Sequence, residues 1–115
     1  MTSLSTHVLD LASGRPAADV AVTLLRRQGP DATAVASRLT DADGRARLLE
    51  AGQLVPGGWR LTYDIGAYYA RGGGQDPASA FLDVVTVDFV VADDDRSYHV
   101  PLLVSPFGYS TYRGS

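Results

Sequence analysis

Residues 84–104 read VVTVDFVVADDDRSYHVPLLV, and this stretch decides the fold class of the chain. It holds two β-rich runs, residues 84–91 and 98–104, which are joined by the acidic turn Asp93-Asp94-Asp95. Runs rich in β-branched and aromatic residues and bounded by turn residues are typical of strands. The stretch therefore predicts two long strands.

The same alternation of short β-type runs and turns continues over the rest of the chain. Further strands are expected at residues 4–10, 20–26, 34–39, 45–49, 59–65 and 108–113. Residues 66–80 include three consecutive glycines and are expected to be mainly loop, with room for one helical turn. Because strands do not alternate with helices, a parallel α/β fold is disfavoured. We predict an all-β fold: a two-sheet antiparallel β-sandwich of about eight strands with at most one short helix, forming a single domain over residues 1–115.

Composition excludes several functional classes. The net charge of −3 and the absence of a basic stripe give no reason to expect a nucleic-acid partner. The chain contains no cysteine, which rules out disulfides and thiolate chemistry. No secretory signal is expected, and no apolar run approaches the ~20 residues of a membrane-spanning helix. These features predict a cytoplasmic protein without a membrane partner.

Sheet edges of the predicted sandwich lack the protection that edge strands commonly have. All ten basic residues are arginine, so no lysine guards an edge. The run 84–91 is rich in β-branched residues. We therefore predict that other subunits cover sheet edges or faces.

Only two histidines are present, His7 and His99, and each falls inside a predicted strand. Period-2 alternation places His7 on the same strand face as Ser5, and His99 on the same face as Pro101. Histidine can take or give a proton near neutral pH. Either histidine alone is more simply an incidental surface or core residue. Their pairing in a chain without others favours a site, although it does not decide the matter.

Two further groups are candidates for binding. Arg45 follows the turn Asp41-Ala42-Asp43-Gly44 and could hold a planar anionic or amide-rich ligand through its forked donors, or it could be a solvated hairpin arginine. Residues 112–115, Tyr-Arg-Gly-Ser, concentrate donors and acceptors within four positions. This segment suggests a site without identifying its ligand, and the alternative is a plain strand end.

Other common sites are disfavoured. The D-x-D-G turn at residues 41–44 lacks the later acidic ligands of a calcium loop. Two distant histidines without cysteine make a poor zinc site, so no metal is expected. There is no G-x-S-x-G nucleophile elbow, and the three glycines at 72–74 are not followed by the lysine of a phosphate-binding loop.

Five motifs together resemble a known family. They read LSTHVLD at 4–10, GRPA at 14–17, TDADGR at 40–45, YHVPLL at 98–103 and YRGS at 112–115. The chain resembles the transthyretin-related 5-hydroxyisourate hydrolases from Leu4 to Ser115. The first three motifs occur in many sandwich modules, whereas YHVPLL and YRGS are highly specific. Departures include Trp59, where the family often has tyrosine, and residues 80–82, which replace a more aromatic stretch.

The resemblance implies an activity and an assembly. The family opens the ring of 5-hydroxyisourate in urate breakdown, giving 2-oxo-4-hydroxy-4-carboxy-5-ureidoimidazoline without a cofactor. It also implies a homotetramer, a dimer of dimers, with sites at the dimer–dimer interface. Carried over by position, the expected catalytic residues are His7, Arg45, His99 and Ser115. The expected substrate-binding residues are His7, Arg45, Tyr112, Arg113 and Gly114.

Two other functions remain as alternatives. A transthyretin-type carrier of thyroid hormone or another hydrophobic aromatic ligand would share the fold, but such carriers have an apolar channel in place of the polar set. A structural sandwich module of an adhesin is disfavoured because no secretory signal is expected. The resemblance leaves open which histidine acts as the base.

Overall fold

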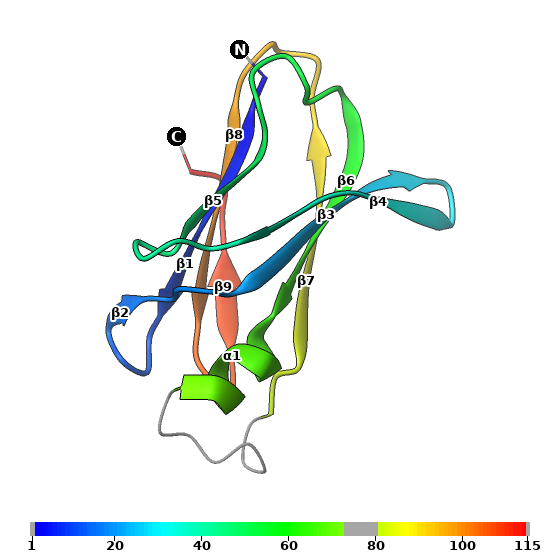
Figure 1. Ribbon diagram of the computed structural model, residues 1–115. Helices are drawn as coiled ribbons and strands as arrows, with labels where there is room; N and C mark the ends of the chain where they lie inside the picture. Colours follow the sequence, from blue (N-terminus) through cyan, green and yellow to red (C-terminus); the bar gives the residue numbers. More distant parts are fainter. Residues whose placement is uncertain (1, 73–80, 115) are drawn as a thin grey trace.

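The computed structural model describes residues 2–72 and 81–114, which contain nine strands and one helix (Figure 1). The elements are β1 (Leu4–Asp10), β2 (Arg15–Pro16), β3 (Ala21–Gln28), β4 (Asp31–Leu39), β5 (Arg45–Leu49), β6 (Gly57–Asp64), α1 (Ile65–Gly72), β7 (Val84–Val91), β8 (Tyr98–Val104) and β9 (Tyr109–Thr111). Within the described residues, no helix is both long and apolar enough to cross a membrane.

The strands form two layers. One sheet has the order β2-β1-β8-β9, with β5 also paired to β1, and the other has the order β4-β3-β6-β7. All pairs are antiparallel except β1 with β8, which run parallel. The predicted β-sandwich is therefore confirmed, with this parallel pair as a difference. Parallel neighbours need a long connection, and the chain between β1 and β8 is long enough to build the whole second sheet.

Alternating side chains fill the space between the sheets. In β1 every second residue is buried, beginning with Leu4, while Ser5, His7 and Leu9 are only half-buried on the other face. In β6 the buried side chains are Trp59, Leu61 and Tyr63. The faces predicted from alternation for β1 are thus confirmed. His7 lies on the outside of its sheet, away from the core.

Helix α1 is longer than the single turn expected from the sequence. It begins directly after β6, where the Asp64 carboxylate accepts a hydrogen bond from the backbone N–H of Ala67 at 3.2 Å, as an N-cap does. Ile65 and Tyr69 are buried beneath it. Capping and burial explain a helix that the glycine-rich composition of the segment concealed. The rest of the predicted loop, residues 73–80, lies outside the described residues.

A buried carboxylate joins the helix to the end of β1. Asp10 accepts hydrogen bonds from the hydroxyls of Tyr69 at 2.7 Å and Tyr68 at 2.9 Å, and from the backbone N–H of Ala12 at 2.9 Å. Burial raises the pKa of Asp10, but these hydrogen bonds together outweigh burial and leave the pKa below its ordinary value. Burial and the neighbouring carboxylate raise the pKa of Tyr68 to about 12. The ionised Asp10 therefore holds the helix against the first sheet.

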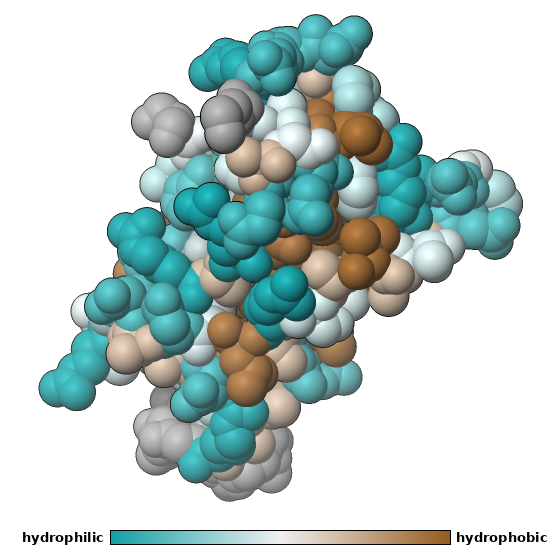
Figure 2. All heavy atoms as spheres, turned by 45° about the horizontal axis from the view of Figure 1, so that its top comes forward, coloured by the Kyte–Doolittle hydropathy of each residue, from teal (hydrophilic) through white to brown (hydrophobic). Residues whose placement is uncertain are grey.

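Apolar side chains reach the surface in separate patches between hydrophilic ones (Figure 2). Edge strands β7 and β9 carry several of the exposed apolar residues. Those with close to half or more of their surface exposed on these strands are Val84, Val90 and Tyr109. The edges are thus open in the single chain.

Candidate active site

Three neighbouring strands carry the polar groups singled out from the sequence. β1 supplies His7, β5 supplies Arg45 and β8 supplies His99. In the strand register, His7 lies opposite Arg45 on one side, and Ser5 lies opposite His99 on the other. The outer face of one sheet therefore brings together residues that are far apart in sequence.

The two imidazoles lie close to each other. Their ring centroids are 6.5 Å apart and the ring planes are inclined by 38°. Because β1 and β8 run parallel, His7 is opposite Pro101, and His99 occupies the diagonal position beside it. The parallel pair is what brings the two histidines together.

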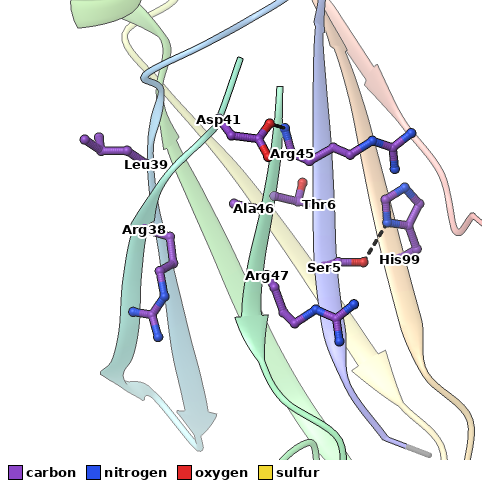
Figure 3. A pocket seen from close by; sticks show the side chains of 9 residues that line it. All are labelled: Ser5, Thr6, Arg38, Leu39, Asp41, Arg45, Ala46, Arg47 and His99. Atoms are coloured by element: carbon purple, nitrogen blue, oxygen red, sulfur yellow. Dashed lines mark hydrogen bonds between the residues drawn. The ribbon is translucent and has the colours of Figure 1, made fainter. Parts of the chain in front are cut away.

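Ser5 contacts His99 directly. The Ser5 Oγ and the His99 Nδ1 are 2.8 Å apart, within hydrogen-bonding distance (Figure 3). Strand alternation puts Ser5 on the same face as His7 but does not mark it as a site residue. Alternation shows which face a residue occupies, whereas this contact depends on the pairing of β1 with β8.

Arg45 is positioned by the turn before it. The Asp41 carboxylate accepts from the backbone N–H groups of Asp43 at 2.9 Å and Arg45 at 3.0 Å. Gly44 has φ of +76°, and its carbonyl accepts from the Val8 N–H at 2.7 Å. A Cβ at Gly44 would lie 2.4 Å from the Val8 carbonyl oxygen, so only glycine permits this approach. The turn thereby sets Arg45 next to His7.

A cavity of about 430 Å³ extends from these strands to the end of β4 in the other sheet (Figure 3). It is lined by Ser5, Thr6, Arg38, Leu39, Asp41, Arg45, Ala46, Arg47 and His99. A neighbouring cavity of about 340 Å³ shares Arg45, Arg47 and His99 with it. Three arginines against one aspartate make the larger cavity cationic, which suits an anionic or carbonyl-rich ligand. His7 is not among the lining residues of either cavity, and it approaches the site through its contact with His99.

The surroundings of His99 favour its neutral form. Burial lowers its pKa, and the charges of Arg45 and His7 lower the pKa further. A neutral imidazole can accept a proton near neutral pH. The site thus contains a potential base beside a permanent cation.

The C-terminal segment reaches the site through Gly114. Its backbone N–H donates to the His99 carbonyl oxygen at 2.7 Å, and the two residues form an antiparallel bridge. Tyr112 and Arg113 line a different, more apolar cavity of about 260 Å³ beside β7. There the Arg113 guanidinium lies 3.8 Å from the centre of the Tyr98 ring. Within one chain, Tyr112 and Arg113 therefore line a different cavity from the ones that Arg45 and His99 line.

Two further points from the sequence concern Ser115 and metal binding. Ser115 lies outside the described residues. In the described part of the chain, no group of three or more histidine, aspartate or glutamate side chains is arranged to hold a metal ion.

The two-sheet sandwich of this topology places the chain in the transthyretin-like class of folds. Residues 4–114 match the HIUase/Transthyretin family, and the chain belongs to that family. The resemblance inferred from the five motifs is thereby confirmed.

The proteins that this chain is similar to include both 5-hydroxyisourate hydrolases and transthyretins. The chain is 52% identical to 5-hydroxyisourate hydrolase of Caulobacter vibrioides over 115 residues, covering 100% of each. A solved structure of Klebsiella pneumoniae 5-hydroxyisourate hydrolase has a TM-score of 0.81 and 39% identity, covering 98% of this chain and 99% of that one. Sea bream transthyretin in complex with thyroxine has a TM-score of 0.84 and 30% identity, covering 96% of this chain and 93% of that one. Because the hydrolase and the transthyretin share the fold, only the residues of the site can distinguish the two functions.

Proposed function

We propose that this protein hydrolyses 5-hydroxyisourate, opening its ring to give 2-oxo-4-hydroxy-4-carboxy-5-ureidoimidazoline in urate breakdown, without a cofactor. Hydrolases of this name are its relatives over the full length of the chain. The observation that carries the proposal is the convergence of His99 and Arg45 on one cavity, with the His7 ring 6.5 Å from that of His99. A cationic, hydrogen-bonding cavity suits a planar, carbonyl-rich heterocycle better than a hydrophobic aromatic hormone.

The reaction has three chemical requirements. A base must take a proton from the attacking water, a cation or donor must stabilise the oxyanion that forms at the carbonyl carbon, and an acid must protonate the ring nitrogen that leaves. His7 and His99 are the groups that can move protons. Arg45 carries a fixed positive charge and would hold the substrate and stabilise the oxyanion through charge-assisted hydrogen bonds.

The remaining site roles follow from the family resemblance. In this proposal Tyr112, Arg113 and Gly114 help to bind the substrate, and Ser115 fixes the water or a histidine. Because Tyr112 and Arg113 line another cavity within one chain, we propose that they act in a site completed by a neighbouring chain.

We propose accordingly that the chain forms a homotetramer, a dimer of dimers, with the sites at the dimer–dimer interface. The candidate groups lie on an outer sheet face, and the edge strands β7 and β9 expose apolar side chains, which supports this assembly. Light scattering at micromolar concentration tests it, and the expected mass is that of four chains of 12.2 kDa each. A monomeric mass contradicts it.

The single domain over residues 1–115 and the cytoplasmic location stay predictions.

The activity is tested with substrate generated in place. Uricase converts urate to hydroxyisourate, and the purified protein is expected to accelerate the decay of its absorbance. His7→Ala and His99→Ala should each lower turnover by at least about a hundredfold, the range of general acid–base assistance, while the assembly persists. Wild-type rates in both variants contradict the assignment of the histidines. If the wild-type protein leaves the decay unchanged but binds thyroxine, the result favours a transthyretin-type carrier over a hydrolase.

A further inference from the structure

One row of residues runs across the outer face of the site sheet. In the strand register, Arg47 of β5 lies opposite Ser5 of β1, Ser5 lies opposite His99 of β8, and His99 bridges to Gly114. The proposed function uses His99 and Gly114 from this row. It gives no role to Ser5, whose hydroxyl makes a hydrogen-bonding contact with the reactive imidazole.

The imidazole of His99 is confined on two sides. The Ser5 Oγ lies 2.8 Å from Nδ1. On the other side, Gly114 packs so closely that a Cβ there would come within 2.7 Å of His99 Cδ2. The ring therefore has little freedom to turn, and the contact with Ser5 is a fixed part of the site.

The surroundings of the ring decide which nitrogen carries the proton of the neutral form. Figure 3 shows Nδ1 turned toward Ser5 and the Nε2 end of the ring turned toward the side chain of Arg45. An N–H at Nε2 would place its positive end toward a cation, whereas a lone pair there is stabilised by the cation. Ser5 is half-buried and lines the cavity, so solvent can accept its hydroxyl hydrogen.

We propose that Ser5 is a positioning residue that accepts a hydrogen bond from His99 Nδ1–H, and so presents the lone pair of Nε2 to the cavity and makes His99 the base. This inference rests on the proposed function for its catalytic consequence. It assigns separate roles to His7 and His99, which the motifs did not distinguish. The same oxygen still accepts from Nδ1–H when His99 becomes positively charged, in a stronger, charge-assisted hydrogen bond.

In this reaction a single histidine, His99, accepts the proton and later returns it. His99 Nε2 takes a proton from water as the water oxygen forms a bond to the carbonyl carbon, and the carbonyl electrons move to its oxygen beside Arg45. The oxyanion then reforms the carbonyl, the bond from carbon to ring nitrogen breaks, and the imidazolium returns the proton to that nitrogen. No other reactant is required. His7, 6.5 Å away between ring centroids, is left to orient the substrate.

Nitrogen NMR of the imidazoles tests the tautomer without substrate. The chain has only two histidines, so a His7→Gln variant assigns both sets of signals. In the wild-type protein, at a pH where His99 is neutral, we expect the proton on Nδ1 and a bare Nε2. Ser5→Ala should abolish this preference, and Ser5→Thr, which keeps a hydroxyl, should retain it. A proton on Nε2 in the wild type overturns the proposal, whether or not the protein is a hydrolase.

Kinetics test the consequence of the tautomer. Ser5→Ala should lower kcat about tenfold with little change in KM, the size expected for one lost hydrogen bond acting on the reacting step. Ser5→Thr should restore most of the rate. Ser37→Ala is the matched control, because it removes a serine hydroxyl that bonds to Thr23 at 3.2 Å on the other sheet. Equal rates in Ser5→Ala and Ser37→Ala contradict the role of Ser5, while inactivity of all variants and the wild type contradicts the proposed function alone.

Discussion

The backbone N–H of Gly114 donates to the carbonyl oxygen of His99 at 2.7 Å, so the C-terminal segment pairs with the strand that carries the proposed base. The close approach that this pairing brings about explains why a glycine occupies the position. Its missing side chain is what lets the segment lie against the imidazole ring.

A methyl group at Gly114 should impair activity more than stability. In Gly114→Ala the new Cβ meets His99 Cδ2 at 2.7 Å and the His99 carbonyl oxygen at 3.3 Å, so the ring or the segment must move. A displacement of this kind costs about a hundredfold in rate. Gly108→Ala is the matched control, since a Cβ there has no atom within 4 Å among the described residues. Steady-state kinetics that give the same kcat for both variants contradict the prediction.

The positive charge of Arg45 should have a measurable effect on the pKa of His99. Burial first, and then Arg45 and His7, lower the pKa of His99 below the ordinary 6.5. If His99 is the base, activity should fall only as pH drops through this lowered pKa, where His99 gains a proton. Arg45→Gln removes one cause, so NMR titration should give a higher pKa for His99 than in the wild type. Arg60→Gln, on the other sheet and paired with Asp88 at 2.6 Å, should leave it unchanged.

Asp10 should stabilise the fold in a pH-dependent way. Asp10→Asn weakens the hydrogen bonds from Tyr68, Tyr69 and Ser13, and we expect a loss of about 2 kcal/mol in the free energy of unfolding at neutral pH. The folded-state pKa is lowered, so this stability is present above the unfolded value of 3.8 and is lost as pH falls through the folded pKa.

Urea denaturation measured from neutral to acidic pH checks the role of Asp10. The difference between wild type and Asp10→Asn should shrink in acid. Asp94→Asn, in the exposed turn before β8, is the control and should have little effect at any pH. A constant difference across the pH range means that the Asp10 charge is not the cause.

Thr6 and Tyr63 form a polar contact inside the core. Thr6 Oγ1 donates to the Val100 carbonyl at 2.6 Å, so the Tyr63 hydroxyl, 2.9 Å away, donates to Thr6. Burial raises the pKa of Tyr63 to about 12. Tyr63→Phe should cost about 1 kcal/mol, and Thr6→Val about 2 kcal/mol because it leaves two buried groups unpaired. In a double-mutant cycle by urea denaturation, the combined variant should lose less than the sum, and strict additivity contradicts the coupling.

Much of the fold was predictable from local pattern. The alternation in residues 4–10 and 57–64 shows the buried faces of β1 and β6, and glycine-containing turns mark most strand ends. Helix α1 was underestimated because its stability comes from Asp64 at its start and from the burial of Ile65 and Tyr69, which composition does not reveal.

The sequence singled out candidate residues for the site but did not predict their arrangement. The motifs selected His7, Arg45 and His99, and the structure brings all three together. Ser5 and Arg47 were not selected. The motifs did select Tyr112 and Arg113, but within the single chain these two residues line another cavity.

By itself the sequence determined that His7 and His99 lie in strands and that His7 shares a strand face with Ser5, because the direction of successive side chains follows from the local geometry of an extended backbone. Only the tertiary structure decided that β1 and β8 are parallel neighbours in the register that pairs Ser5 with His99. These two residues are 94 positions apart, and their pairing depends on how the two sheets pack around the common core.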